Sequence, residues 1–138
     1  MSECLFCKIV HQEIPSYKIF EDAWTYAFLD ISPVSIGHTL VIPKLHVDTL
    51  TDADPETLAH WMQTTQHVSR LICEKIGGSD FNLIQNNGSD AGQMIPHLHM
   101  HIIPRIAGDG LRHWPQGPHP THEELTELAG TLRSLNRE

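Results

Sequence analysis

The amino-acid sequence predicts an α+β fold with a mainly antiparallel sheet of about five strands, one long helix and a C-terminal helix. Short apolar runs bounded by turn residues recur before residue 105, and a long helical pattern interrupts them only once. Strands and helices therefore do not alternate regularly, which favours α+β over a parallel α/β arrangement. The 138 residues are enough for one compact domain with its own core.

Three strands are expected before the long helix, over 18–21, 24–29 and 38–42. A turn at Glu21-Asp22 separates the first two, and the third is closed by Pro43. A proline has no N–H to donate to a sheet ladder, so it suits the end of a strand.

The long helix is expected to begin at Asp54-Pro55, because aspartate caps helices and proline fits the first helical position. Apolar residues then recur near helical spacing until Gly77-Gly78 stops the helix. Strands over 81–85 and 97–104 complete the sheet, with a polar loop between them.

The C-terminal part is expected to be an irregular connection over 108–120 followed by a helix. Thr121-x-x-Glu124 is a capping box that predicts the start of this helix. We interpret 1–138 as a single domain and 106–138 as its C-terminal extension. The helix carries the leucines Leu125, Leu128, Leu132 and Leu135.

Composition narrows the functional classes. The formal net charge is −8, with 17 acidic and 9 basic residues, which argues against a broad nucleic-acid surface. No segment approaches the roughly 20 apolar residues of a membrane span, so no membrane partner is expected. The start Met1-Ser2-Glu3-Cys4 has no signal-peptide pattern, and we expect a cytoplasmic protein.

Three histidines alternate with apolar residues in the last expected strand. Successive side chains of a strand point to opposite faces, so His97, His99 and His101 share one face. The other face is apolar and belongs in a core; it carries Leu98, Met100 and Ile102. Three imidazoles in strict alternation favour chemistry over a purely structural role.

A catalytic metal bound by all three rings is one alternative for this face. At about 3.3 Å per residue, His97 and His101 would lie roughly 13 Å apart along a strand. Zinc–nitrogen bonds are about 2.1 Å long, so both rings can scarcely reach one ion. Separate roles for the three histidines fit better.

The run His97-Leu98-His99-Met100-His101-Ile102-Ile103 resembles the signature of the histidine-triad (HIT) nucleotide hydrolases and transferases. The resemblance extends from Cys4 to about Arg105, about three-quarters of the chain, and includes Asp30-Ile31-Ser32-Pro33, the run Gly37 to Lys44, and Gly92-Gln93. The Cys pair and Ile103-Pro104-Arg105 are most similar to the bacterial branch. Membership implies a HIT-like fold and a homodimer.

The resemblance also implies the chemistry. His99 would attack the α-phosphorus of a nucleoside phosphate derivative, such as a dinucleoside polyphosphate or a nucleoside phosphoramidate, and form a covalent nucleotidyl-histidine that water hydrolyses. His101 would contact the phosphate and help to neutralise developing charge.

Nucleotide contacts are carried over in the same way. Gln93 and Asn86 would hydrogen-bond the phosphate and leaving group, beside Gly92, and Asp30 with Ile31 would lie at the ribose. For Asp30 and Asn86, ordinary turn chemistry is the alternative.

One position departs from the family pattern. Relatives usually carry Ser or Thr where this chain has Met94, and that hydroxyl is thought to assist the leaving group. The departure favours a second hypothesis, a nucleotide-binding regulatory module with little turnover. Retention of all three triad histidines favours the enzyme, because binding alone needs no nucleophile.

Cys4 and Cys7 form a C-x-x-C that is open to three interpretations: a redox pair, half of a metal site, or two small buried residues. No thioredoxin-like pattern surrounds it. The resemblance nominates His46 and His97 as two further ligands, which together give a closed, structural Cys2His2 zinc site. His97 would then serve the metal, while His99 and His101 face the substrate.

Overall fold

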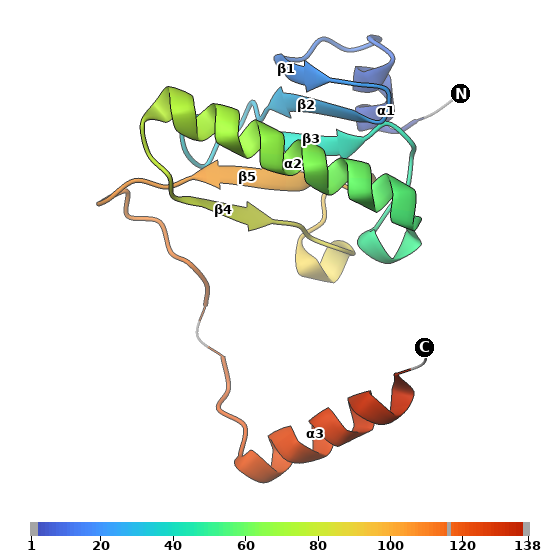
Figure 1. Ribbon diagram of the computed structural model, residues 1–138, viewed down its shortest axis with the longest axis vertical. Coiled ribbons are helices and arrows are strands. Elements are labelled where there is room, and N and C mark those ends of the chain that lie inside the picture. Colours follow the sequence, from blue (N-terminus) through green and yellow to red (C-terminus); the bar gives the residue numbers. More distant parts are fainter. Residues whose placement is uncertain (1–2, 116, 137–138) are drawn as a thin grey trace.

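A five-stranded antiparallel sheet forms the centre of the computed structural model, which describes residues 3–115 and 117–136. The strands are β1 (Lys18–Glu21), β2 (Thr25–Leu29), β3 (Thr39–Pro43), β4 (Phe81–Ile84) and β5 (Met100–Pro104), in the order β1-β2-β3-β5-β4 (Figure 1). The α+β prediction with five strands is confirmed. Among the described residues, no helix is long and apolar enough to cross a membrane.

The helix α2 (Pro55–Ile76) crosses one face of the sheet (Figure 1). It begins as predicted, with the Asp54 carboxylate accepting from the Thr57 N–H at 2.8 Å, and ends at Gly77 in the left-handed conformation. Its Trp61 is buried and donates its indole N–H to the Val41 carbonyl at 2.9 Å. The core between α2 and the sheet includes Leu98, Met100 and Ile102, the predicted apolar set.

A short helix that the sequence reasoning did not predict, α1 (Leu5–Val10), covers part of the opposite face. Its Phe6 and Ile9 pack with Phe28, Leu40 and Ile42 in a second core cluster. Because α2 covers one face and α1 the other, the central strands are buried on both faces. Two 3-10 turns, η1 (Leu50–Asp52) and η2 (Ser89–Ala91), were also not predicted.

The last strand begins at Met100, so the prediction of a strand from His97 is wrong at its start. The pairing of β3 with β5 ends at Val41 and Met100, and β3 itself ends at Pro43. Leu98 instead donates its N–H to the carbonyl of Val47 in a loop, at 2.7 Å. Residues 97–99 thus lie outside the ladder, although their side chains keep the alternation. The other predicted strand ends either match, as at both ends of 18–21, or shift by one residue, within the usual uncertainty of element boundaries.

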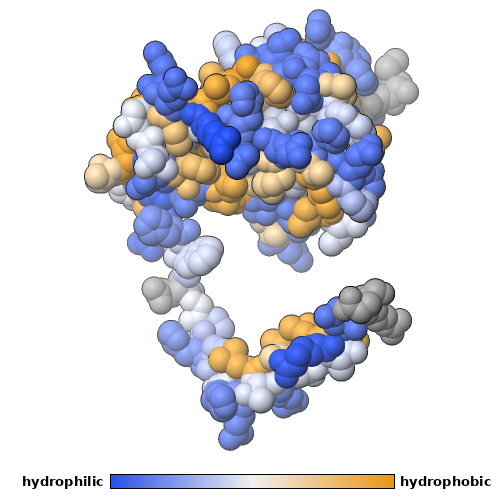
Figure 2. Space-filling model, viewed as in Figure 1, coloured by the Kyte–Doolittle hydropathy of each residue, from blue (hydrophilic) through white to orange (hydrophobic). Residues whose placement is uncertain are grey.

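The C-terminal helix α3 (His122–Leu135) has the predicted capping box, with Thr121 accepting from the Glu124 N–H and Glu124 from the Thr121 N–H. It lies away from the sheet at the end of an extended connection (Figure 1). Apolar side chains are visible along it in Figure 2, and its leucines are between 54% and 63% exposed. The division of the chain at residue 106 stays a prediction.

Candidate functional site

The three triad histidines lie on the α1 side of the sheet, opposite the core under α2. His97 and His99 are buried, and His101 is half-buried. The rings of His99 and His101 are neighbours, with centroids 5.0 Å apart. His97 joins a different group, with two cysteines, so the structure divides the triad between two clusters.

The protonation of His99 is fixed by its own backbone neighbourhood. Its Nδ1 lies 2.6 Å from the carbonyl oxygen of His97, which can only accept, so Nδ1 carries the ring proton. Nε2 of the neutral ring therefore holds a free lone pair. Burial lowers the pKa of His99 below its usual value, which keeps the ring neutral. A neutral imidazole with a fixed lone pair is a competent nucleophile.

His101 is in hydrogen-bond contact with His38, a buried histidine that directly precedes β3. Nε2 of His38 lies 2.9 Å from Nδ1 of His101, and Asp30 Oδ2 lies 3.5 Å from the same His38 nitrogen. Burial, aided by the neighbouring rings of His99 and His38, lowers the pKa of His101 to about 4. Both rings that face the site are thus neutral near pH 7.

A cavity of about 420 Å³ opens beside these two rings. That volume is in the range of small-molecule sites. Its lining combines polar residues, including both histidines, with apolar residues of the N-terminal segment and of β2. The lining residues are Leu5, Phe6, Ile9, Ile14, Pro15, Ser16, Phe28, Leu29, Asp30, Ile31, Leu40, Asn86, Gly92, Met94, Ile95, His99 and His101.

Four of the five additional residues predicted to bind nucleotide line this cavity: Asp30, Ile31, Asn86 and Gly92. Asp30 also makes the turn contact that was its alternative explanation, accepting from the Ser32 N–H at 2.8 Å. Gln93 is not in the lining. Its amide accepts from Gly88 N–H at 2.7 Å and donates to the carbonyls of Asp48 and Ile95, so it joins three backbone segments.

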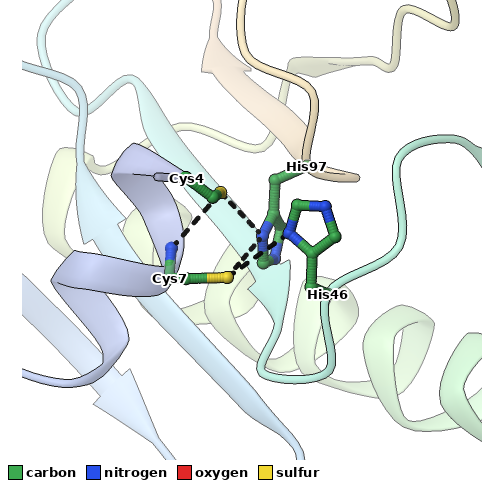
Figure 3. A group of neighbouring side chains, drawn as sticks. All are labelled: Cys4, Cys7, His46 and His97. Atoms are coloured by element: carbon green, nitrogen blue, oxygen red, sulfur yellow. Dashed lines mark hydrogen bonds between the residues drawn. The ribbon is translucent and has the colours of Figure 1, made fainter. Parts of the chain in front are cut away.

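The second cluster consists of Cys4, Cys7, His46 and His97 (Figure 3), whose ligand atoms all lie within 4.8 Å of one another. Sγ of Cys7 lies 3.3 Å from Nδ1 of His46 and 3.6 Å from Nδ1 of His97. Sγ of Cys4 lies 3.4 Å from Nδ1 of His97. The four residues predicted as metal ligands are therefore brought together, and they could hold a metal ion.

The far nitrogen of each histidine in this cluster has its own partner. Nε2 of His97 donates to the Pro43 carbonyl at 2.8 Å, and Nε2 of His46 donates to the Asp48 carboxylate at 2.8 Å. Each Nδ1 lone pair is consequently directed at the thiols. Such outer partners orient the histidine ligands of metal sites.

Sequence reasoning missed two contributions to the site. Phe6 of α1 contacts the ring of His99 edge-on at 5.1 Å and forms part of the cavity wall. The sequence did hold a signal for α1, since the apolar residues between and after Cys4 and Cys7 recur at helical spacing. The second contribution is His38, which is buried and whose contact with His101 depends on the pairing of β3 with β5.

Comparison with known protein families finds a single family model that matches most of the chain. The model of the HIT domain family matches residues 11–108. Adenylylsulfatase HINT3 of Arabidopsis thaliana is 44% identical over 110 residues, which cover 80% of this chain but only 56% of that protein. Adenosine 5'-monophosphoramidase hnt1 of Schizosaccharomyces pombe is 43% identical over 134 residues, covering 95% of this chain and 96% of its own length.

A solved structure shares the complete arrangement. The crystal structure of a HIT family member from Bacillus subtilis is similar with a TM-score of 0.90 at 34% sequence identity, covering 99% of both chains. Because this match covers nearly the full length, it includes the region of the C-terminal helix as well as the sheet.

Proposed function

This chain belongs to the HIT domain family, and on that premise we propose that it is a hydrolase or transferase that cleaves the α-phosphate linkage of nucleoside phosphate derivatives through a nucleotidyl-histidine. The observation that carries the proposal is the hydrogen bond from His99 Nδ1 to the His97 carbonyl. It leaves a neutral ring whose Nε2 lone pair belongs to a residue lining a ligand-sized cavity.

The reaction proceeds in two displacements. His99 Nε2 attacks the α-phosphorus, the new P–N bond forms, and the bond from phosphorus to the leaving group breaks; the leaving group takes the electron pair and, where it is an amine, a proton. Water then attacks the same phosphorus and loses a proton to solvent, the P–N bond breaks with its electron pair returning to Nε2, and the nucleoside monophosphate is released. Dividing one difficult displacement into two lowers the barrier of each.

The rest of the cavity positions the nucleotide. His101 donates a hydrogen bond to a phosphoryl oxygen, which stabilises charge as the phosphorus is attacked. Asn86 and the backbone at Gly92 lie at the phosphate, and Asp30 and Ile31 at the ribose. The apolar residues of the lining, such as Ile9 and Ile14, accept the base.

The names of the relatives suggest a substrate class. An adenylylsulfatase and an adenosine 5'-monophosphoramidase both act on an adenylyl group joined to a small leaving group. We propose substrates of this kind, including dinucleoside polyphosphates. Chromatography of adenosine phosphoramidate, adenylyl sulfate, diadenosine polyphosphates and nucleotide sugars after incubation with the protein should show release of the nucleoside monophosphate. No release from any of them would contradict an enzymatic function.

Zinc is the metal that best suits the Cys4–Cys7–His46–His97 cluster. Zinc–sulfur bonds of about 2.3 Å and zinc–nitrogen bonds of about 2.0–2.1 Å place S and N atoms about 3.6 Å apart around a tetrahedral ion. The S···N distances in the cluster, 3.3 to 3.6 Å, fit this separation. Four protein ligands would make the ion structural, because it would join the start of α1 to His97, two residues before the nucleophile.

The pH dependence should follow the depressed pKa values of the two site histidines. The pKa of His99 lies below 6.5 and that of His101 is about 4. Protonation removes the nucleophilic lone pair, so kcat/KM should stay level from about pH 8 to below pH 6.5 and fall only in more acid solution. A pH profile with metal content followed in parallel measures this; an acid limb centred at 6.5 or above would contradict it.

A further prediction concerns Met94 and the protonation of the leaving group. Its side chain lines the cavity and is 86% exposed, but a thioether has no proton to donate. Met94→Ser should raise kcat for a phosphoramidate by roughly tenfold, part of the usual gain from general acid catalysis. Met94→Ala is the matched control, since it shortens the side chain without adding a hydroxyl. Equal kcat values for the two variants would contradict the prediction.

A nucleotide-binding regulatory module is the second candidate function, and Met94 is the residue that favours it. Tight binding of a mononucleotide with no turnover in the substrate panel would support this alternative.

A cytoplasmic homodimer completes the proposal. Exposed apolar side chains on β4 and along α3 leave surfaces suited to a protein interface. Light scattering should give twice the chain mass, and a monomer at working concentration would contradict the dimer. Cell fractionation should recover the protein with the cytoplasm rather than with membranes.

A further inference from the structure

One hydroxyl in the lining of the cavity has no part in the chemistry described so far. Ser16 lies between α1 and β1, is half-buried, and is one of the residues that line the cavity. Its Oγ lies 2.7 Å from the phenolic oxygen of Tyr26, a residue of β2 that is only 4% exposed and does not line the cavity. The pair therefore connects a buried tyrosine to the space in which a ligand would lie.

Burial determines which of these two hydroxyls donates the hydrogen bond. Among the described residues, Ser16 Oγ is the one hydrogen-bond partner of the Tyr26 hydroxyl. If Ser16 donated, the phenolic proton would be left without an acceptor at a buried residue, which is costly. A phenol is also the more acidic hydroxyl and hence the stronger donor. Tyr26 therefore donates, and Ser16 accepts.

Ser16 keeps its own proton in this arrangement. A serine hydroxyl has one proton and two lone pairs, and Tyr26 occupies only one of the lone pairs. Within the described part of the chain, no second hydrogen bond engages Ser16 Oγ. A hydroxyl that accepts one hydrogen bond is polarised and becomes a better donor. Ser16 thus offers an oriented O–H group to a ligand in the cavity.

The other polar side chains of the lining already have partners in the proposed function, at the phosphate or the ribose: Asp30, Asn86, His99 and His101. Ser16 directly follows Ile14-Pro15, which also line the cavity. A nucleobase has apolar ring faces, and it has hydrogen-bond acceptors along its edge, the ring nitrogens and carbonyl oxygens. Apolar lining residues suit the faces, and the Ser16 hydroxyl suits the edge.

We propose that Ser16 is a specificity-determining residue that donates a hydrogen bond to an acceptor atom of the nucleobase, with Tyr26 orienting its hydroxyl. This contact lets the cavity distinguish a nucleotide from a ribose phosphate that carries no base. The inference rests on the proposed function in one respect, since it requires that the cavity binds a nucleotide.

NMR titration with adenosine 5'-monophosphate (AMP) and with ribose 5-phosphate measures the contribution of the base without any turnover. Loss of one neutral hydrogen bond weakens binding by roughly three- to tenfold. Ser16→Ala should therefore raise the Kd for AMP by this factor and leave the Kd for ribose 5-phosphate unchanged. Ser16→Thr, which keeps the hydroxyl, should bind AMP as the wild type does. Ser79→Ala is the matched control, because Ser79 is exposed and outside the lining.

A purely structural role, in which Ser16 only holds Tyr26 in place, predicts a different result for Tyr26→Phe. This variant removes the bond between the two residues but leaves the Ser16 hydroxyl on the cavity wall, so its Kd for AMP should stay within about twofold of wild type. The double variant Ser16→Ala/Tyr26→Phe leaves no phenolic proton without an acceptor, and it should bind AMP as weakly as Ser16→Ala. Thermal unfolding checks that each variant is folded.

Three outcomes would overturn the proposal: equal Kd values of Ser16→Ala and the wild type for AMP, an equal loss for AMP and ribose 5-phosphate, or the same loss in Tyr26→Phe as in Ser16→Ala. If the wild type binds AMP but cleaves no substrate, the enzymatic function fails, while these titrations still decide the role of Ser16. A wild type that does not bind AMP would overturn both.

Discussion

Replacing His99 with alanine is expected to reduce turnover by at least about 10⁴-fold, because no other described side chain is placed to form the covalent intermediate in its stead. Phe6 and the polar residues of the cavity stay in place, so a nucleoside monophosphate should still bind with an affinity within a few-fold of wild type. Steady-state kinetics and calorimetric titration with the mononucleotide measure the two effects separately.

His67→Ala is a suitable control for the loss of one imidazole. His67 is exposed on α2, its ring packs against that of Phe20, and it does not line the cavity. Its turnover should be close to wild type. A second variant, His99→Gly, leaves space for free imidazole, which should restore part of the activity. Full activity in His99→Ala would exclude His99 as the nucleophile.

Removing one thiolate from the metal cluster is expected to have the largest effect on stability. Cys7→Ser takes away a proposed ligand whose Sγ lies against both His46 and His97, and loss of the proposed structural metal should lower the free energy of unfolding by about 4 kcal/mol or more. Elemental analysis should give about one zinc per wild-type chain and much less in the variant, and thermal unfolding reports the change in stability.

Cys73→Ser is the matched control, since Cys73 lies on α2 outside the cluster. It should keep its zinc and change stability by no more than about 1 kcal/mol. A chelator should lower the melting temperature of the wild type and of Cys73→Ser, but not that of Cys7→Ser. A metal-free wild type that melts at the same temperature as the zinc-loaded protein would contradict the structural zinc site.

The alternation of histidine and apolar residues was readable from the sequence because a period of two needs no knowledge of the fold. Leu98, Met100 and Ile102 do enter the core under α2. The start of β5 could not be predicted from this alternation. It depends on where β3 ends and on the bond from Leu98 to the distant carbonyl of Val47.

The helix α1 was not predicted because its local sequence lacks the usual signals of a helix. It has only six residues, and its N-cap is Cys4, whose Sγ accepts from the Cys7 N–H, rather than the usual Ser, Thr, Asp or Asn. The capping box at Thr121, by contrast, predicted α3 correctly, because both of its hydrogen bonds are made within four residues.

Contacts between distant segments limited how many of the site contacts could be predicted from the sequence. His38 meets His101 only through the register of β3 and β5, and Gln93 satisfies its amide on three separate backbone segments. Neither arrangement is encoded in local spacing. The family resemblance predicted the candidate metal cluster, whose four members come from the N-cap and first turn of α1, from the loop after β3 and from the segment before β5.

The stereochemistry at phosphorus tests the central claim most directly. A nucleotide substrate with a chiral, sulfur-substituted α-phosphate should be hydrolysed in ¹⁸O-labelled water with overall retention, because two in-line displacements, first by His99 and then by water, each invert the phosphorus. Overall inversion would mean that water attacks directly, and it would contradict a nucleotidyl-histidine on this chain.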